Sequence, residues 1–230
     1  MSVTLLITTQ NRTPLLANSL QRLSTLTLPD EIVVVDDGGS DGCETLCQTW
    51  WEAGLPIHYL YNHQPFDAQC SLARNIGIKA TDADMILTSE PELLWDTDLL
   101  AQMLAQHEAH PSDVISAGTI RHEQPDGGPV VTEGWVAPFA ALYRRDWLVK
   151  INGWDEGFPD PWAWEDVDLL TRLRENGHGQ VIDREIVCTH QYHEPRWCDQ
   201  EANEAYFKAK VFPRDILANP GRQWGQCLTR

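Results

Sequence analysis

The stretches that decide the fold are Val3-Thr4-Leu5-Leu6-Ile7-Thr8 and Glu31-Ile32-Val33-Val34-Val35-Asp36. Both are short apolar runs rich in β-branched residues, a pattern typical of strands buried on both faces of a sheet. Between them, Thr13-Pro14 is typical of an N-cap followed by proline at the first helical position. Four leucines then recur at helical spacing and are predicted to face inward: Leu15, Leu16, Leu20 and Leu23. A strand, a helix and a strand of this length predict a parallel sheet with right-handed crossovers, and hence an α/β fold.

The alternation of strands and helices continues to about residue 112 and then becomes less regular. The first part predicts strands at Ile57–Tyr61 and Met85–Thr88. It also predicts one helix through Trp50 and Trp51 and another over Ala68–Ala80. A third helix, capped by Asp96 or Thr97, is predicted through Leu99, Leu100, Met103 and Leu104. The second part predicts strands at Val114–Ala117, Pro129–Thr132, Gln180–Ile182 and Glu185–Thr189, helices at Arg145–Ile151, Asp166–Asn176 and Gln200–Val211, and a loosely packed tail over Pro213–Arg230. We therefore expect two halves, 1–112 and 113–230, that share one core.

The charge of the chain limits its partners. It has 230 residues and a net charge of −17, with 34 acidic side chains against 17 basic ones. This balance argues against nucleic acid as a partner, because phosphate contacts need clustered Lys and Arg. A nucleotide ligand remains compatible with it, since a divalent cation can neutralise a diphosphate locally.

The sequence predicts neither export nor a membrane span. No stretch approaches the ~20 consecutive apolar residues that a spanning helix needs, and the N-terminus lacks the basic region of a signal peptide. The six cysteines form no CxxC pair, and the spacing of Cys43 and Cys47 fits one face of a helix. We therefore expect reduced thiols and a cytoplasmic protein.

Polar residues follow the first two predicted strands, at Thr8–Arg12 and Asp36–Asp41. In an open parallel sheet, ligands bind where the strands end and the loops diverge. A carboxylate after the second strand can accept hydrogen bonds from a base N–H or from ribose hydroxyls. The usual GxGxxG fingerprint after the first strand is missing, and Asp-Asp-Gly-Gly alone is equally typical of an ordinary turn.

A second group of polar residues surrounds the fourth strand. Gly77 lies inside the helix that precedes this strand, where glycine costs about 1 kcal/mol relative to alanine, which indicates close packing on the sheet. Glu90-Pro91-Glu92 follows the strand. Two carboxylates there could hold a hard divalent cation that bridges a diphosphate. The alternative is a solvated acidic turn.

Taken together, these motifs resemble family 2 glycosyltransferases with the GT-A fold. Val3–Arg12 is similar to that family's first strand, Glu31–Asp41 to its second strand and uridine-contacting loop, and Ala73-Arg74-Asn75-Ile76-Gly77 to its helix motif. Glu90-Pro91-Glu92 lies where the family carries its DxD metal motif. The departure is that Glu is one methylene longer than Asp and that Pro91 is unusual at the middle position, which puts the strength of metal binding in doubt.

The resemblance implies roles for the residues of these motifs. Glu92 would be the metal ligand, and Glu90 would face the ribose or the metal. The nucleotide would be contacted by Thr8, Asp37 and Arg74, with Asp36 and Asn75 in support.

A third group combines tryptophans with carboxylates, in Gly153–Phe158 and in Trp162-Ala163-Trp164-Glu165-Asp166-Val167-Asp168. Sugars pack their C–H faces on aromatic rings and offer hydroxyls to carboxylates, so this mixture is typical of a carbohydrate site. A carboxylate at a helix start could also deprotonate an acceptor hydroxyl. The alternative is that Glu165 and Asp166 only complement the helix dipole.

The same segment resembles a C-terminal module of galactosyltransferases and chondroitin-type polymerases. The resemblance implies that Asp166 is the catalytic base, with Glu165 beside it in the catalytic pair. Glu165 and Trp164 would bind the acceptor or donor sugar, Trp162 would help to shape the acceptor site, and Asp168 would support them.

Two histidines in Cys188–Pro195 are candidates to complete the metal shell. His190 ends a predicted strand and His193 follows closely, and a neutral imidazole is a common metal ligand. The resembling enzymes also carry a metal-ligating histidine in this region. A zinc site built from Cys188, His190 and Cys198 is an alternative with poor spacing.

We therefore expect transfer of a sugar from a UDP-linked donor to an acceptor hydroxyl, with inversion, assisted by manganese or magnesium. The half 1–112 would bind the donor and the half 113–230 the acceptor. A nucleotidyltransferase would need a glycine-rich loop after the first strand, which is missing. A non-catalytic nucleotide- or carbohydrate-binding GT-A domain is the alternative that the Glu90-Pro91-Glu92 replacement supports. Donor sugar, acceptor and oligomeric state stay open, and the surplus of tryptophans leaves room for a homo-oligomer interface.

Overall fold

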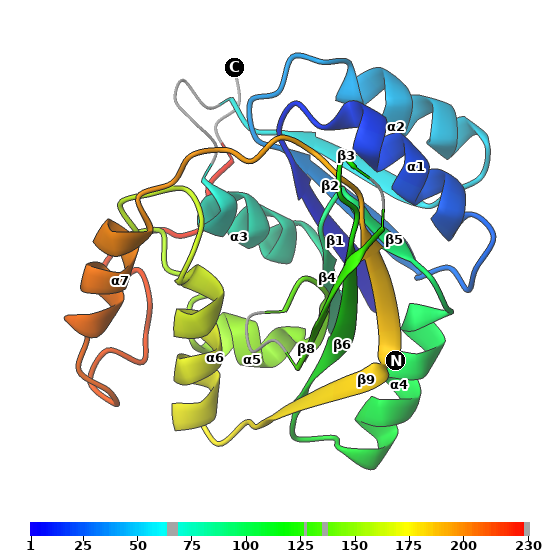
Figure 1. Cartoon of the computed structure of the whole chain (residues 1–230). Helices are drawn as coiled ribbons and strands as arrows, with labels where there is room; N and C mark the ends of the chain where they lie inside the picture. The colour runs from blue at the N-terminus through cyan, green and yellow to red at the C-terminus, as the bar shows by residue number, and fades with distance from the viewer. Residues whose placement is uncertain (64–68, 127, 135–137, 228–230) are drawn as a thin grey trace.

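The computed structural model describes residues 1–63, 69–126, 128–134 and 138–227. These residues form one mixed sheet with helices on both faces (Figure 1). Its first part is parallel, with β2 and β4 on either side of β1 and β3 beyond β2. The bounds of these strands are Val3–Thr9 for β1, Glu31–Asp36 for β2, Ile57–Tyr61 for β3 and Met85–Ser89 for β4.

The second part of the sheet mixes both directions. β8 (Ala141–Arg144) pairs antiparallel with β4 and with β6 (Val114–His122), and β6 pairs parallel with β9 (Gln180–His190). β5 (Leu93–Trp95) runs antiparallel to β9, and β7 (Val130–Glu133) runs antiparallel to β6. Because β8 is reversed relative to both of its neighbours, β4, β6 and β9 share one direction. The carboxyl ends of β1, β2, β4, β6 and β9 therefore meet at one edge of the sheet.

Helices cover the two faces of the sheet in separate groups (Figure 1). One face is packed by α1 (Thr13–Leu23), α2 (Cys43–Glu52) and α4 (Leu99–Ala109). The other face is packed by α3 (Cys70–Ala80), α5 (Arg145–Lys150) and α6 (Glu165–Glu175). A last helix, α7 (Gln200–Lys208), lies outside α6. The two buried clusters account for the near-continuous apolar runs of β1, β2 and β4, because these strands contribute side chains to both clusters.

The structure confirms several local expectations. Cys43 and Cys47 are both buried on one face of α2. Gly77 packs against Leu6 of β1 so closely that a Cβ atom there would overlap the leucine side chain. The α/β class is confirmed as well, although the sheet is mixed rather than wholly parallel. No helix in the described part of the chain is long and apolar enough to cross a bilayer.

Several predicted boundaries were wrong. Leu15 is only half-buried, and α1 begins at Thr13 with the Asp41 carboxylate accepting hydrogen bonds from the Thr13 N–H and hydroxyl, each at 2.7 Å. Asp98, not Asp96 or Thr97, caps α4 by accepting the Ala101 N–H. The two short strands expected at 180–189 are one strand, β9. Two strands were missed, β5 and β8, and residue 68, the expected start of the third helix, lies outside the described residues.

The C-terminal segment is more ordered than its sequence indicated. Ala218 and Trp224 are buried, and the Trp224 ring lies 3.8 Å from Lys79 Nζ of α3. Asn219 is also buried, and its side chain bonds to the backbone of residues 152–156. The expectation of a loosely packed tail was therefore wrong for the described residues up to 227.

Candidate active site

The antiparallel strands β5 and β9 bring together three side chains that could hold a metal ion, at the carboxyl edge of the sheet. Leu93 of β5 pairs with His190 of β9, which places Glu92 beside the end of β9. The Gln191 N–H donates to the Glu92 carbonyl oxygen at 3.0 Å and fixes this register. Ligand atoms of Glu92, His190 and His193 all lie within 4.8 Å of one another. The strand pairing therefore explains why residues almost 100 positions apart converge.

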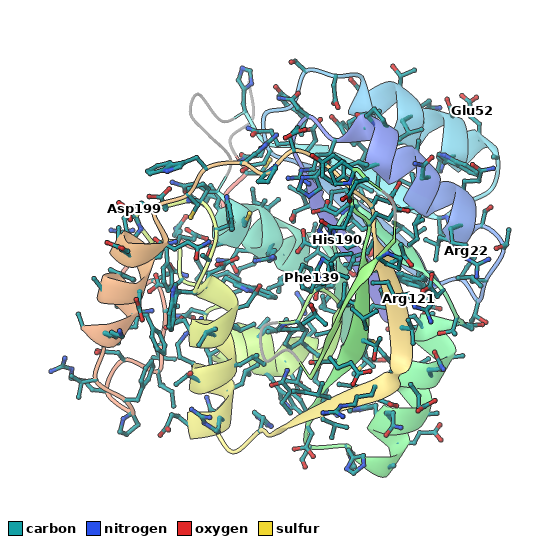
Figure 2. The ribbon with its side chains drawn as sticks, in the orientation of Figure 1. Arg22, Glu52, Arg121, Phe139, His190 and Asp199 are labelled. Carbon is teal, nitrogen blue, oxygen red and sulfur yellow. The ribbon has the colours of Figure 1, made fainter. Side chains whose placement is uncertain are left out.

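His190 lies among aromatic rings where β9 ends (Figure 2). Its ring centroid is 5.5 Å from that of Phe139 and 5.2 Å from those of His122 and His193. Burial, and next the neighbouring His190, lower the pKa of His122. This setting favours the neutral form of His122, whose ring lies beside that of His190.

Glu92 is the negative centre of this cluster. Its Oε1 lies 3.0 Å from Arg12 Nη1, 3.4 Å from His193 Nε2 and 3.6 Å from His190 Nε2. Burial opposes ionisation, but the two imidazoles and then the guanidinium outweigh it, so the pKa of Glu92 is held below its usual range. Contact with Glu92 in turn raises the pKa of His193. Glu92 is therefore anionic at neutral pH.

Buried polar atoms without hydrogen-bond partners mark the same place. Among the described residues, Glu92 Oε2, His193 Nε2 and Arg12 Nη1 are buried and have no hydrogen-bond partner, since the Arg12–Glu92 ion pair is not aligned as a hydrogen bond. Such atoms cost free energy unless an ion or ligand satisfies them. A carboxylate and two imidazoles suit a divalent transition-metal ion, and a guanidinium suits an anion. The residues present therefore fit a divalent cation with an anion beside it.

Arg74 of α3 joins the sheet edge to the start of α6. It lies 2.8 Å from Glu90, 3.1 Å from Glu165 and 3.3 Å from Asp166, and it is nearly buried. The Trp154 indole N–H donates to Asp166 Oδ1 at 2.8 Å. Two acidic motifs that are about 75 residues apart in sequence thus share one guanidinium.

The carboxylates around Arg74 outnumber its single charge. Burial, and next the charge of Asp166, raise the pKa of Glu165 to about 7. Burial also raises the pKa of Glu90 against the opposing effect of Arg74. Glu165 Oε2 is buried and has no hydrogen-bond partner among the described residues. This part of the site therefore holds an extra proton near neutral pH or accepts a further hydrogen-bond donor.

The two aspartates at the end of β2, Asp36 and Asp37, are both buried and have separate partners. Asp36 accepts a hydrogen bond from the Tyr59 hydroxyl at 2.9 Å. Asp37 accepts from Asn62 Nδ2 and from the Gln69 N–H, each at 2.6 Å, and so ties the end of β3 to the start of α3. Burial raises the pKa of both carboxyls. With Thr8 also nearly buried at the end of β1, these groups line the adjoining part of the same edge.

Two of the expected site residues have other partners. Asn75 is fully buried: its Nδ2 donates to the Trp154 carbonyl and to Glu156, and its Oδ1 accepts the Trp154 N–H. Asp168 is fully buried between Arg172 and Lys210. Both side chains are 0% exposed, so neither reaches the surface on which a ligand would lie. This corrects the expectation that Asn75 contacts the nucleotide, whereas the supporting role expected for Asp168 stays a prediction.

The tryptophan-rich segment before α6 lies against α7. Trp162 and Trp164 are half-buried, and the Trp164 ring stacks on Phe207 with a centroid separation of 5.4 Å. The Cys198 thiol donates to the Trp162 carbonyl at 2.8 Å. The described residues thus place Cys198 on this loop, outside the cluster formed by Glu92 and the two histidines, so the zinc alternative was wrong.

Sequence reasoning missed two residues of the site. Arg12 was included in the polar segment after the first strand but was given no role of its own, yet it contacts Glu92. Gln191 is nearly buried and donates to the carbonyls of Leu15 and Glu92 at 3.1 and 3.2 Å, which anchors the segment that carries His193. Its position next to His190 was the available signal, but a glutamine alone carries little information.

Comparisons with known proteins bear on the family and the fold of the chain. The sequence model "Glycosyl transferase family 2" matches residues 4–153. No curated protein matches the chain significantly. The matched region includes Arg12, Arg74 and Glu92 and ends before Glu165 and Asp166.

Solved structures share the fold. The mannosyltransferase PcManGT from Pyrobaculum calidifontis, in complex with GDP-Man and Mn²⁺, superposes with a TM-score of 0.65 at 18% identity, over 82% of this chain and 56% of that one. S. aureus TarS 1–349 in complex with UDP gives 0.66 at 16% identity, over 84% and 61%. The same protein with UDP-GlcNAc gives 0.65 at 15% identity, over 92% and 62%. The chain thus spans less than two thirds of the length of these structures, which have the GT-A fold that its own sheet reproduces. With the family model covering well over half of the sequence, the chain belongs to glycosyl transferase family 2.

Proposed function

We propose that the chain is a hexosyltransferase that moves a sugar from a UDP-linked donor to an acceptor hydroxyl with inversion at the anomeric carbon. One observation carries this proposal: Arg74 holds Glu90 at the carboxyl edge of the sheet within reach of Glu165 and Asp166 at the start of α6. A donor-binding edge and a candidate base are thereby brought to one place. Neither motif alone would distinguish a transferase from a binding domain.

The donor would lie along the ends of β1, β2 and β4. Asp37, supported by Asp36, would accept a hydrogen bond from the base, because each of its oxygens keeps a second lone pair beside the contact already made. Thr8 and Arg74 would contact the nucleotide, and Glu90 the ribose. The half 1–112 would therefore provide the donor site.

Glu92, His190 and His193 would hold manganese or magnesium. The unpartnered Glu92 Oε2 and His193 Nε2 support this assignment, and nitrogen ligands favour manganese over magnesium. Bound there, the ion would supply positive charge to the departing diphosphate. Arg12 would add hydrogen bonds to the same phosphates from Nη1, which pairs electrostatically with Glu92 but makes no hydrogen bond among the described residues.

Asp166 would accept the proton of the attacking hydroxyl. Its side chain keeps 17% exposure, and the Trp154 N–H fixes one of its two oxygens. Glu165 would share the Arg74 charge and keep the site from accumulating a further negative charge. Trp162 and Trp164 would offer ring faces to the acceptor sugar, as in the galactosyltransferase and chondroitin-polymerase module that this segment resembles.

The location and the assembly of the protein are part of the same proposal. All six cysteines are unpaired, which is the usual state of thiols in a reducing compartment and supports a cytoplasmic location. Trp197 is 80% exposed and Trp51 is 57% exposed, which leaves room for a homo-oligomer interface or for larger acceptors.

A second candidate, a non-catalytic nucleotide-binding domain, is favoured by one observation. Arg74 forms ion pairs with both carboxylates at the start of α6, so a purely structural role can also account for their presence there. Calorimetry with UDP, with and without Mn²⁺, followed by a screen of UDP- and GDP-sugars for nucleotide release, separates the two. Turnover that Asp166→Asn abolishes supports the transferase. Tight UDP binding without turnover in either protein supports the binding domain, and a preference for GDP overturns the uridine assignment.

A further inference from the structure

The backbone just before α6 is held in an unfavourable conformation. Ala163 and Trp164 have φ angles of 79° and 71°, and neither is glycine. Left-handed conformations of such residues are strained, and they persist only where the surroundings enforce them. Trp164 is the N-cap of α6 and makes no capping hydrogen bond with its side chain. The helix that begins with Glu165 and Asp166 therefore takes its starting direction from a loop that would not adopt this shape alone.

One buried side chain from α7 enforces that shape. Asn203 is 0% exposed, and its Nδ2 donates to the carbonyl oxygens of Trp162 at 2.8 Å and Ala163 at 2.9 Å. Nδ2 also lies 3.3 Å from the Asp160 carbonyl, and Oδ1 accepts the Asp160 N–H at 3.0 Å. A single amide thus satisfies backbone groups on both sides of the turn. No other residue type of this size offers two donors and an acceptor in one plane.

The helix that carries Asn203 is itself anchored to the body of the molecule. Lys210, just beyond α7, lies 2.6 Å from Asp155 and also contacts the buried Asp168 of α6. The Phe207 ring stacks on Trp164. α7 is therefore fixed to both ends of the loop, and these contacts hold the helix that carries Asn203 in place.

We propose that Asn203 is a positioning residue for the reaction: it holds the 160–164 turn in its left-handed conformation and thereby sets the direction of Asp166 and of the tryptophan rings beside it. This inference rests on the proposed function, in which Asp166 is the base. Asn203 itself touches no substrate. Its loss would misplace the base without disturbing the nucleotide edge, which is built by other strands.

The first test compares Asn203→Ala and Asn203→Asp with Asp199→Ala. Asp199, labelled in Figure 2 at the start of α7, accepts the Ala202 N–H at 3.0 Å and caps the same helix without bonding to the turn. We expect both Asn203 variants to lose kcat by about 10²-fold, the scale of a 1 Å misplacement, with KM for the donor and UDP affinity unchanged. Asp199→Ala should keep kcat. Equal losses in all three variants, or a loss of UDP affinity, would overturn the proposal.

A second test uses the strain directly. Ala163→Gly removes the Cβ atom that makes the left-handed conformation costly. If Asn203 acts by enforcing that conformation, then adding Ala163→Gly to Asn203→Ala should recover kcat at least tenfold over Asn203→Ala alone. The same change in the wild-type chain should alter kcat little. Absence of recovery, with both proteins folded by circular dichroism, argues against the positioning role.

A third readout does not depend on turnover. The Asp168 N–H donates to the Trp164 carbonyl at 2.9 Å and reports the first turn of α6. Hydrogen exchange of this amide should speed up at least tenfold in Asn203→Ala and Asn203→Asp but not in Asp199→Ala. Unchanged exchange overturns the inference even if the protein is a transferase. Faster exchange in a protein that transfers no sugar supports the positioning role of Asn203 and contradicts only the proposed function.

Discussion

The two sides of the candidate site are held in place by different means. On the nucleotide side, Glu92 and His190 meet because β5 and β9 pair in one register, so backbone hydrogen bonds set their positions. On the α6 side, the loop that leads to Asp166 is not part of the sheet. Three asparagine side chains from distant segments satisfy its backbone instead: Asn75, Asn203 and Asn219.

This difference predicts how substitutions on each side affect the protein. A strand edge is supported by many equivalent hydrogen bonds, so the loss of one side chain there should affect the ligand more than the fold. A loop held by single buried amides has no such reserve, and each lost amide leaves carbonyl or N–H groups buried without partners. We therefore expect substitutions on the nucleotide side to act on binding, and substitutions on the α6 side to act on turnover and stability.

The largest expected effect is that of Asp166→Asn. An amide cannot accept the proton of the attacking hydroxyl, so kcat should fall by about 10²- to 10⁴-fold, the usual contribution of a general base. UDP affinity should stay within about twofold, because β1, β2 and β4 bind the nucleotide. Steady-state kinetics and calorimetry measure the two quantities. Asp146→Asn, at another helix start, is the control for helix-dipole effects and should keep full activity. Weakened UDP binding in Asp166→Asn would mean that the two sides are not separate.

The next effect is that of Glu92→Gln on metal binding. Loss of a residue that only hydrogen-bonds to a metal ligand typically weakens metal binding by about 10- to 100-fold. Removing the Glu92 carboxylate itself should weaken Mn²⁺ binding by more than this, while the fold is kept. Titration of Mn²⁺ by calorimetry, in the presence and absence of UDP, measures the change. Glu123→Gln is the control, since its carboxylate accepts the Tyr192 N–H on the same segment without joining the cluster. Mn²⁺ binding that survives in Glu92→Gln would remove the cluster from the proposal.

The sequence predicted the nucleotide side better than the support of the α6 side, because strand ends are local features and buried side-chain contacts are not. The apolar strands and the acidic residues after them placed Asp37, Glu90 and Glu92 correctly at one edge, because strand ends are a local property. The pairing of Glu92 with His190 depended on β5, a strand of three residues with no pattern of its own. On the α6 side, Glu165 and Asp166 were visible as a helix start.

What the sequence could not show was the support beneath that helix start. Asn203 and Asn219 lie in segments where asparagine is common and uninformative, and their partners are carbonyl oxygens that every residue carries. Asn75 was placed in the nucleotide site because the motif around it fits that site. Its neighbour Arg74 does face the site, and one step along a helix turns a side chain by about 100° away from it.

A direct comparison of the two sides uses a pair of asparagines in the same conformation. Asn219 (φ 52°) is buried and its side chain bonds to three backbone groups of residues 152–156, whereas Asn11 (φ 54°) is exposed and its side chain accepts the Ser40 N–H. Glycine tolerates this conformation, so Asn→Gly removes the side-chain bonds alone. We expect Asn219→Gly to lower the free energy of unfolding by about 1–3 kcal/mol and Asn11→Gly by about 0.5 kcal/mol. Urea denaturation measures both, and similar losses would contradict the distinction between the two sides.

A further effect is a pH dependence of stability to which Glu165 contributes on the α6 side. Burial raises the pKa of Glu165 to about 7, so between pH of about 4.5 and 7 the folded chain keeps a proton that the unfolded chain has released. The free energy of unfolding should therefore fall as pH rises through this window, by up to about 1.4 kcal/mol per pH unit for one proton. Glu165→Gln removes the titration and should flatten this part of the profile.

Urea unfolding at pH 5, 6, 7 and 8 measures the slope, and the difference between wild type and Glu165→Gln isolates Glu165 from Asp36, Asp37 and Glu90, whose pKa values burial also raises. Glu175→Gln, at the exposed end of the same helix, is the matched control. If Glu165→Gln leaves the slope unchanged, Arg74 already stabilises the ionised carboxylate fully, and the α6 side holds no extra proton. Asp166 would then lie beside a fully ionised Glu165, and its capacity to accept a proton would depend on that second negative charge.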